Sequence, residues 1–260
     1  MKNPEVKMWM CFPSIYSFSL SSLGYLWISK EYEERDDVSV ERVCSDTELT
    51  HFSPKELDFI AFSFSFDLDF LNIFKMLDKY NIPLKAEDRD ETYPLVMVGG
   101  PVVTANPMPY SKFFDVFFIG DGEGINSKVV DVYKANKGKS KDEILKALSE
   151  LDGVFVPKYK KEVEKATVSL ENCVYSPIIS EDAYFKNTFI VEIARGCSNC
   201  CAFCLASYLN LPQRNVHLDK VLEALDLGLS FTNKIALLGA NVCAHPDMDA
   251  ICNFLLEKMA

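Results

Sequence analysis

Four cysteines are crowded into one short segment of the chain, Cys197, Cys200, Cys201 and Cys204. Three of them are separated by three residues and then by two, in the order Cys197, Cys201, Cys204. Three thiolates in one loop can hold three corners of a cubane iron–sulfur cluster, because cluster irons take cysteine sulfur as a ligand. The fourth iron would have no ligand from this loop, and open metal positions bind substrates or cofactors. The spacing therefore predicts a reactive cluster rather than one that only carries electrons.

Three other interpretations of these cysteines stay open. A structural zinc site would use all four thiols, although such sites usually join two separate CxxC pairs and four ligands in so short a run would be strained. A CxxC redox pair would join Cys197 to Cys200 or Cys201 to Cys204. The thiols could also be buried without binding metal. Metal analysis separates the cluster from these alternatives.

The composition indicates a globular intracellular protein. Of 260 residues, 48% are apolar, which is enough for a sizeable core, and the remaining five of nine cysteines are scattered. The net charge of −11 disfavours non-specific nucleic-acid binding, which needs neutralising Lys and Arg. No secretory signal and no run of roughly 20 apolar residues is present, so we expect a cytoplasmic protein without a membrane partner. In that compartment cysteines stay reduced or bind metal.

The elements that would position the cysteines begin with alternating strands and helices in residues 1–135. Expected strands are Val6–Phe12, Val38–Cys44, Asp58–Ser65, Pro94–Val98 and Phe113–Ile119, and expected helices are Leu20–Arg35, Leu68–Tyr80 and a segment ending near Asn136. Such alternation predicts the α/β class, with a parallel sheet covered on both faces.

A connector is predicted over residues 136–185, and a second domain over 186–260. The connector holds a short helix, Glu143–Leu151, capped by Ser140 or Asp142, and a strand at Val154–Val156. The second domain begins with a strand, Thr188–Ile193, followed by the cysteine loop. Expected after it are a helix, His217–Leu227, stopped by Gly228, a strand, Ile235–Leu238, and a helix, Met248–Met259. This is about two βα units.

The segment from Glu192 to Cys204 resembles the signature CxxxCxΦC of radical S-adenosylmethionine (radical SAM) enzymes, with Phe203 as the aromatic residue. The resemblance implies that Cys197, Cys201 and Cys204 hold a [4Fe–4S] cluster. It implies that the fourth iron chelates S-adenosylmethionine, which is cleaved reductively to methionine and a 5′-deoxyadenosyl radical. Phe203 would then lie near the adenine.

A second SAM contact is implied at Gly239. In the family, a glycine-rich segment after the second barrel strand contacts the SAM amino group, and the matching segment here is Leu238–Asn241. It lacks the common Gly-Gly-Glu sequence.

The motifs Gly99-Gly100-Pro101, Asn106-Pro107 and Ile119–Glu123 resemble those of one radical SAM branch, which carries a cobalamin-binding-like domain before the barrel. The resemblance implies a Rossmann-like, flavodoxin-like parallel sheet followed by the first βα units of a TIM-type barrel. Gly99 and Gly100 would let a ligand approach the carboxyl edge of the sheet. The first loop has no Asp-x-His-x-x-Gly motif, so two alternatives remain, cobalamin binding without the usual imidazole and a domain that only packs on the barrel.

Other polar residues have more than one interpretation. His51, His217 and His245 lie among polar or turn residues and are expected to be solvated rather than metal-ligating. Arg195 and Arg214 flank the cysteines and would contact a carboxylate or phosphate, or form ion pairs. A third polar segment, Gly120–Gly124, is expected to be a strand–helix turn rather than a phosphate loop.

The predicted function is that of a radical SAM iron–sulfur enzyme acting on an unknown substrate. By resemblance, it would receive an electron from a reductant such as flavodoxin or ferredoxin. Radical SAM barrels typically have six βα units, so the chain looks truncated within the barrel, or a second chain completes it, and an exposed sheet edge is expected. The alternative is a non-catalytic iron–sulfur or zinc-binding remnant that serves as an interaction protein.

Overall fold

The computed structural model describes residues 4–159 and 162–259. The chain divides into two compact units. The first comprises the residues up to Ser19 and Ile28–Thr167, and the second comprises Leu20–Trp27 and the residues from Val168 onward. Within the described residues, no helix is both long enough and apolar enough to cross a membrane.

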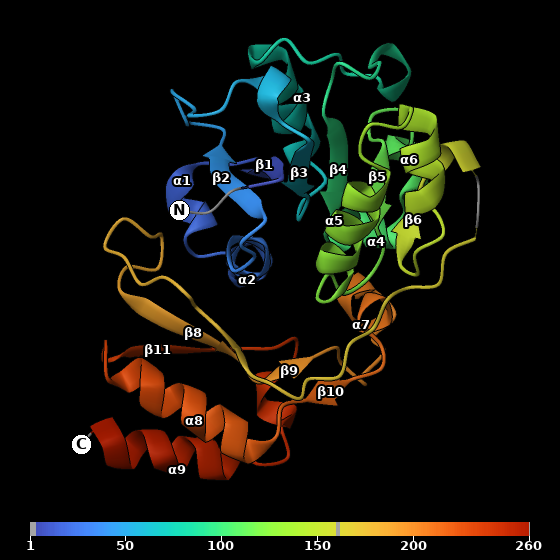
Figure 1. The fold of residues 1–260 in the computed structure, drawn as a ribbon. Helices are drawn as coiled ribbons and strands as arrows, with labels where there is room; N and C mark the ends of the chain where they lie inside the picture. Colours follow the sequence, from blue (N-terminus) through green and yellow to red (C-terminus); the bar gives the residue numbers. More distant parts are fainter. Residues whose placement is uncertain (1–3, 160–161, 260) are drawn as a thin grey trace. The chain divides into compact units, whose positions relative to one another are not determined.

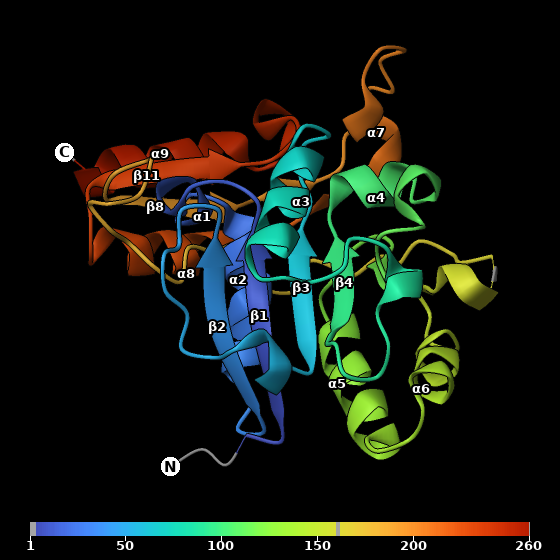
Figure 2. The same cartoon turned by 90° about the horizontal axis from the view of Figure 1, so that it is seen from above.

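The first unit is built on a six-stranded sheet in the order β2-β1-β3-β4-β5-β6, as predicted for an α/β fold. The first five strands in this order are parallel and β6 is antiparallel to β5. Four of the parallel strands lie side by side in Figure 2. The strands are β1 Val6–Phe12, β2 Val38–Cys44, β3 Phe59–Ser63, β4 Leu95–Gly99, β5 Val116–Phe118 and β6 Val154–Phe155.

Helices cover both faces of this sheet because each has an apolar side. In α3 the buried residues are Ile73, Met76 and Leu77, whose spacing of three and four places them on one side of the helix. They pack with Trp9, Ile60 and Val96 of the sheet. On the opposite face, Tyr133 of α5 packs edge-on against Phe59 at 4.5 Å between ring centroids. The helices within the first unit are α1 Tyr16–Ser19, α3 Asp69–Lys79, α4 Pro101–Ala105, α5 Ile125–Asn136 and α6 Lys141–Leu148, and α2 Leu23–Glu33 is divided between the two units after Trp27.

Residues 136–167, which the sequence places in a connector, form part of the first unit. Ser140 caps α6, because its hydroxyl accepts from the Glu143 amide at 3.4 Å while the Glu143 carboxylate accepts from the Ser140 amide at 3.1 Å. This confirms Ser140 as the cap. Strand β6 extends the sheet at β5, so the short strand predicted at Val154–Val156 is also confirmed.

The second unit contains a three-stranded sheet in the order β11-β8-β7, and its strands β11 and β8 lie side by side in Figure 1. Its parallel pair, β8 Thr188–Glu192 and β11 Lys234–Leu238, forms the core of two βα units, and β7 Val174–Tyr175 is antiparallel to β8. Helices α8 Leu218–Leu229 and α9 Met248–Met259 lie side by side on one face of this sheet. Among the described residues, β11 pairs only with β8, so it is the end strand of the sheet, in agreement with the expected open edge.

Gly228 does not stop α8, contrary to the sequence prediction. It lies inside the helix and is buried. A Cβ atom at this position would lie 2.3 Å from the ring of Phe189 on β8. The glycine is therefore required for close packing of the helix on the strand, and α8 continues to Leu229.

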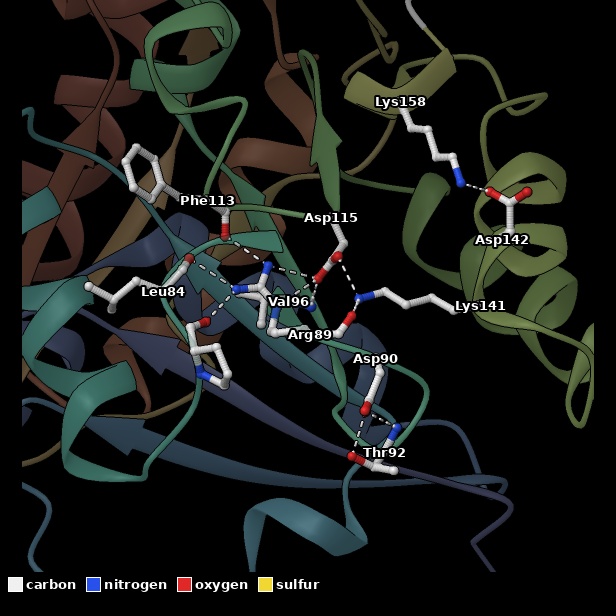
Figure 3. Close-up of polar contacts among 11 residues, drawn as sticks. Leu84, Arg89, Asp90, Thr92, Val96, Phe113, Asp115, Lys141, Asp142 and Lys158 are labelled. Atoms are coloured by element: carbon white, nitrogen blue, oxygen red, sulfur yellow. Dashed lines mark hydrogen bonds and ion pairs between the residues drawn. The ribbon is translucent and has the colours of Figure 1, made fainter. Parts of the chain in front are cut away.

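A buried ion-pair network joins the amino ends of β4 and β5 in the first unit (Figure 3). Arg89 Nη2 lies 3.0 Å from Asp115 Oδ2, and the Lys141 ammonium lies 2.9 Å from Asp115 Oδ1. Asp115 Oδ2 also accepts from the Val96 amide at 2.9 Å. The remaining Arg89 donors reach the carbonyl oxygens of Pro83, Leu84 and Phe113. Both charges of the pair are thus fully hydrogen-bonded where water is excluded.

We expect Asp115→Asn to lower the free energy of unfolding by about 3 kcal/mol, because it leaves two cations without their buried counter-charge. Urea denaturation followed by circular dichroism measures the change. Glu87→Gln is the matched control, because Glu87 forms an exposed pair with Lys85 and its loss should cost less than about 0.5 kcal/mol. Equal effects of the two variants would contradict this role for Asp115.

Candidate metal centre

The cysteine loop leaves and re-enters the second unit through a short antiparallel pair. Strand β9, Ala194–Arg195, pairs with β10, Arg214–Asn215, so the two ends of the loop are held together. Gly196 follows β9 with φ +84°, and a Cβ there would lie 2.4 Å from the carbonyl oxygen of Asn210. The chain can therefore enter the loop in this way only with glycine before Cys197.

The four cysteines of the loop differ in exposure. Cys197 is buried at the start of the loop, Cys201 and Cys204 are half-buried, and Cys200 is exposed. Cys200 also has a left-handed backbone, with φ +47°. Its carbonyl oxygen accepts from the hydroxyl of Tyr208 at 2.8 Å. The three cysteines of the signature thus run from the interior of the unit to its surface.

The local fold directs hydrogen-bond donors at the thiol of Cys204. Cys204 precedes the short helix α7, Leu205–Leu209. Hydrogen bonds from the hydroxyl and the amide of Ser207 lower the pKa of the Cys204 thiol, and the amide of Ala206 contributes to the same effect. These donors stabilise a thiolate, which is the form that binds iron.

The three signature sulfurs are not gathered into a ready site. In residues 4–159 and 162–259, no three Cys, His, Asp or Glu side chains are grouped so that they could hold a metal ion. All three thiols are nevertheless free and lie in one loop. The donor type therefore fits an iron–sulfur cluster, and metal binding would have to draw the sulfurs together.

Phe203 lies on the open side of the loop and is 92% exposed. Leu205 and Tyr208, which follow it in α7, are also exposed. A large aromatic ring left in water costs free energy, so exposure of several such side chains around three thiols indicates a surface that contacts another molecule or segment.

Gly239 lies beside the strand that leads into the cysteine loop. A Cβ at Gly239 would lie 3.1 Å from the carbonyl oxygen of Ala194 in β9. Ile193, between β8 and β9, donates its amide to the carbonyl oxygen of Leu238 at 2.9 Å. The structure thus brings Gly239 and the start of the cysteine loop to the same edge of the β8–β11 pair.

The two arginines near the loop make local contacts. Arg195 forms a bidentate ion pair with Glu192, with Nε–Oε1 at 2.9 Å and Nη2–Oε2 at 2.7 Å. Arg214 donates Nη1 to the carbonyl oxygen of Val168 at 2.6 Å. The Glu192 carbonyl oxygen accepts from the Cys173 thiol at 3.3 Å, and burial raises the pKa of that thiol to about 12. Arg195 therefore fits the ion-pair interpretation, and Cys173 is a structural thiol.

His245 is buried, contrary to the prediction that the histidines are solvated. Only 3% of it is exposed, and its Nε2 lies 3.0 Å from the carbonyl oxygen of Val216. His51 and His217 are exposed, as expected. The turn-rich sequence around His245 concealed its burial because a polar turn can fold back over the core.

In the first unit, Gly100 allows two backbone segments to approach closely. It has φ +118°, and a Cβ would lie 2.5 Å from the carbonyl oxygen of Phe64. Gly99, the last residue of β4, lies beside Phe118. Gly100 is therefore required for the close approach of the Phe64 backbone, and ligand binding at Gly99 and Gly100 stays a prediction.

The glycine-rich turn before α5 is occupied by a carboxylate of the chain itself. Glu31 accepts from the side chain of Asn126 at 2.8 Å and from the amide of Gly124. Burial raises the pKa of Glu31, and these hydrogen bonds oppose the rise. A phosphate at this helix start would meet a like charge, so the geometry fits a strand–helix turn.

A family model described as radical SAM proteins, N-terminal, matches residues 28–157, half of the 260-residue chain. The chain belongs to this radical SAM family. The matched residues lie within the first unit, so the family assignment is independent of the cysteine signature, which belongs to the second.

The curated relatives of this chain include an uncharacterized protein and two tRNA-modifying synthases. An uncharacterized protein of Methanocaldococcus jannaschii is 28% identical over 212 residues, which are 77% of this chain and 42% of the relative. A tRNA-2-methylthio-N(6)-dimethylallyladenosine synthase of Chlorobium phaeobacteroides is 37% identical over 73 residues, 27% of this chain and 16% of the relative. The synthase of the same name from Myxococcus xanthus is 26% identical over 135 residues, 46% of this chain and 29% of the relative. The chain spans less than half the length of each.

We expect Cys204 to be alkylated readily in the reduced, metal-free protein at pH 7.5, because the donors at Ser207 lower the pKa of its thiol. Ser207→Ala should slow Cys204 by about two- to threefold, since the rise in thiol pKa is partly offset by greater nucleophilicity. Mass spectrometry after timed iodoacetamide labelling measures each site. Cys252, exposed on α9, is the internal control and should be unchanged. Equal slowing of both thiols would point to a general change in the fold.

Proposed function

We propose that this radical SAM protein is an enzyme in which Cys197, Cys201 and Cys204 hold a [4Fe–4S] cluster. The observation that carries the proposal is the geometry of one loop. It contains three free thiols with the signature spacing and begins at the carboxyl edge of the parallel pair β8–β11, where Gly239 also lies. Ligands of parallel α/β folds bind at this edge of the sheet.

Each cysteine has a distinct part in this proposal. Cys197 is buried next to the β9–β10 pair and would anchor the cluster to the rigid part of the unit. Cys201 and Cys204 are half-exposed and would close around the metal from the open side. Because the sulfurs are not gathered in the described structure, cluster binding and ordering of the loop should be coupled, as in other metal sites formed by flexible ligands.

When bound, the cluster would bind S-adenosylmethionine at its fourth iron and supply one electron for reductive cleavage to a 5′-deoxyadenosyl radical. Phe203 would provide an apolar face for the adenine, which explains a phenylalanine that is 92% exposed. Gly239 would leave the backbone next to β9 accessible to the SAM amino group. The electron would come from a reductant such as flavodoxin or ferredoxin.

The residues of the first unit do not fit cobalamin bound through an imidazole. The loop after β1 contains no histidine, and Pro13 in that loop accepts a hydrogen bond at its carbonyl oxygen from Asn72 at 3.0 Å. His51, the only histidine of this unit, is exposed between β2 and β3. We therefore assign no chemical step to cobalamin, and we propose that the first unit serves as a packing partner for a barrel.

One further partner follows from this proposal. The outer edge of β11 would receive the next barrel strand, from a further segment or from a second chain. The substrate stays open, because the two synthases named above act on tRNA whereas the net charge of −11 does not favour nucleic-acid binding. The alternative function is a cysteine-rich interaction module that binds iron or zinc without cleaving SAM.

Anaerobic reconstitution with iron and sulfide tests the proposal. We expect about four irons with matching acid-labile sulfide per chain, and a reduced-cluster EPR signal that SAM alters. Cys201→Ser should lose most of the iron, because only two ligands would remain. Cys200→Ser is the matched control, since this exposed cysteine lies outside the signature and its loss should leave the cluster intact.

Each alternative gives a different result. Tight binding of zinc without iron, lost in both the Cys200 and the Cys201 variants, would establish a four-cysteine zinc site. An iron–sulfur cluster whose EPR signal does not respond to SAM would support the non-catalytic module.

A further inference from the structure

The segment that follows β11 is attached at both of its ends to the backbone that flanks the cysteine loop. At its start, the carbonyl oxygen of Leu238 accepts from the amide of Ile193 at 2.9 Å. Ile193 lies between β8 and β9, four residues before Cys197. This bond continues the β8–β11 pairing by one residue, so the segment leaves the sheet next to the entrance of the cysteine loop.

At its end, the same segment is attached through a side chain. The Nε2 atom of His245 lies 3.0 Å from the carbonyl oxygen of Val216, the residue that follows β10. The amide of Val216 donates to the carbonyl oxygen of Ile193 at 2.9 Å. Three hydrogen bonds and the segment 239–244 therefore form a closed ring. The ring passes through Leu238, Ile193, Val216 and His245.

The imidazole is held in one tautomer. His245 Nδ1 accepts from the amide of Asp247 at 3.2 Å, so the ring proton is on Nε2 and is donated to Val216. The histidine backbone is also engaged, since its amide donates to Val242 and its carbonyl oxygen accepts from Met248, both at 3.1 Å. With 3% of the residue exposed, the Val216 carbonyl has no water to replace a lost donor.

We infer that His245 is a positioning residue that holds the segment Gly239–Ala244 against the cysteine loop, and so sets the SAM-binding geometry of the site. This inference rests on the proposed function for its ligand, but its mechanical part concerns only this chain. Gly239 lies close to Ala194, and Asn241 and Val242 begin the 3₁₀ turn Val242–Ala244 that ends at His245. If the bond to Val216 is lost, the segment keeps the bond at Leu238 and the packing of Val242 against the core, but its His245 end is no longer bonded to the backbone at the exit of the cysteine loop.

Two conservative variants separate this role from a local structural one. His245→Gln places an amide nitrogen near the position of Nε2 and can keep the bond to Val216. His245→Asn places an oxygen near the position of Nδ1 and can keep the bond from Asp247, but it is too short to reach Val216. A positioning role through Val216 predicts that the Gln variant is close to wild type. A local role at the start of α9 predicts instead that the Asn variant is close to wild type.

The first measurement is amide hydrogen exchange in the metal-free protein. The amides of Ala244 and His245 donate within the 3₁₀ turn, so exchange of the peptide covering 239–245 reports on its attachment. We expect that peptide to exchange roughly tenfold faster in His245→Asn than in His245→Gln, as befits the loss of one buried hydrogen bond. Peptides of α8 are the internal control and should exchange equally in both variants.

The second measurement is SAM affinity after cluster reconstitution, followed by the EPR signal. We expect equal iron content in all variants, a dissociation constant roughly tenfold higher in His245→Asn, and a change of less than about twofold in His245→Gln. Equal losses in both variants, or no change in either, would overturn the positioning role. A wild-type protein that assembles no cluster would overturn the proposed function instead, and hydrogen exchange would still decide whether His245 holds the segment.

Discussion

One residue without a functional side chain organises the candidate site. Ile193, fully buried between β8 and β9, donates its amide to Leu238 and accepts at its carbonyl oxygen from Val216. These two bonds join the end of β11, the entrance of the cysteine loop and its exit. A buried backbone group that lost its partner would cost about 1–3 kcal/mol, so neither connection is easily broken. The cysteine loop can thus change shape while its two ends stay fixed.

In the first unit, the buried ion-pair network lies at the amino ends of the strands. The Arg89–Asp115 pair and Lys141 lie at the amino ends of β4 and β5, whereas the glycine motifs lie at the carboxyl ends. A buried ion pair is poor evidence for high stability, because desolvation offsets much of the attraction. It does, however, favour a single arrangement of the segments it joins, since any other leaves charges without partners. The network therefore specifies how α6 and the segment before β4 pack on the sheet.

Residue patterns were sufficient to predict most of this architecture. The bounds of β1, β2 and α9 agree with those expected from apolar periodicity, and the cap of α6, Ser140, is one of the two residues that the local motif offers. Long-range contacts were not predictable in this way. From the sequence, Gly228 is expected to end a helix. The structure places it inside α8, where the close approach of the Phe189 ring leaves no room for a Cβ atom. The burial of His245 likewise depends on Val216, 29 positions away.

In the candidate site too, local motifs were predictable from the sequence and long-range geometry was not. Cys197, Cys201 and Cys204 lie in one local motif, so their proposed role as cluster ligands follows from their spacing, whereas the role proposed for Phe203 follows from the family resemblance. The arrangement of the three sulfurs could not be predicted in this way, because in the described structure they are not grouped as a metal site, and under the proposed function the metal would have to draw them together. The fold itself supplies the backbone that surrounds the loop. This backbone consists of Gly196, the β9–β10 pair and the segment after β11. Under the proposed function, a backbone surround that is complete before the metal binds would lower the entropic cost of cluster assembly, since only the residues from Cys197 to Cys204 would have to rearrange.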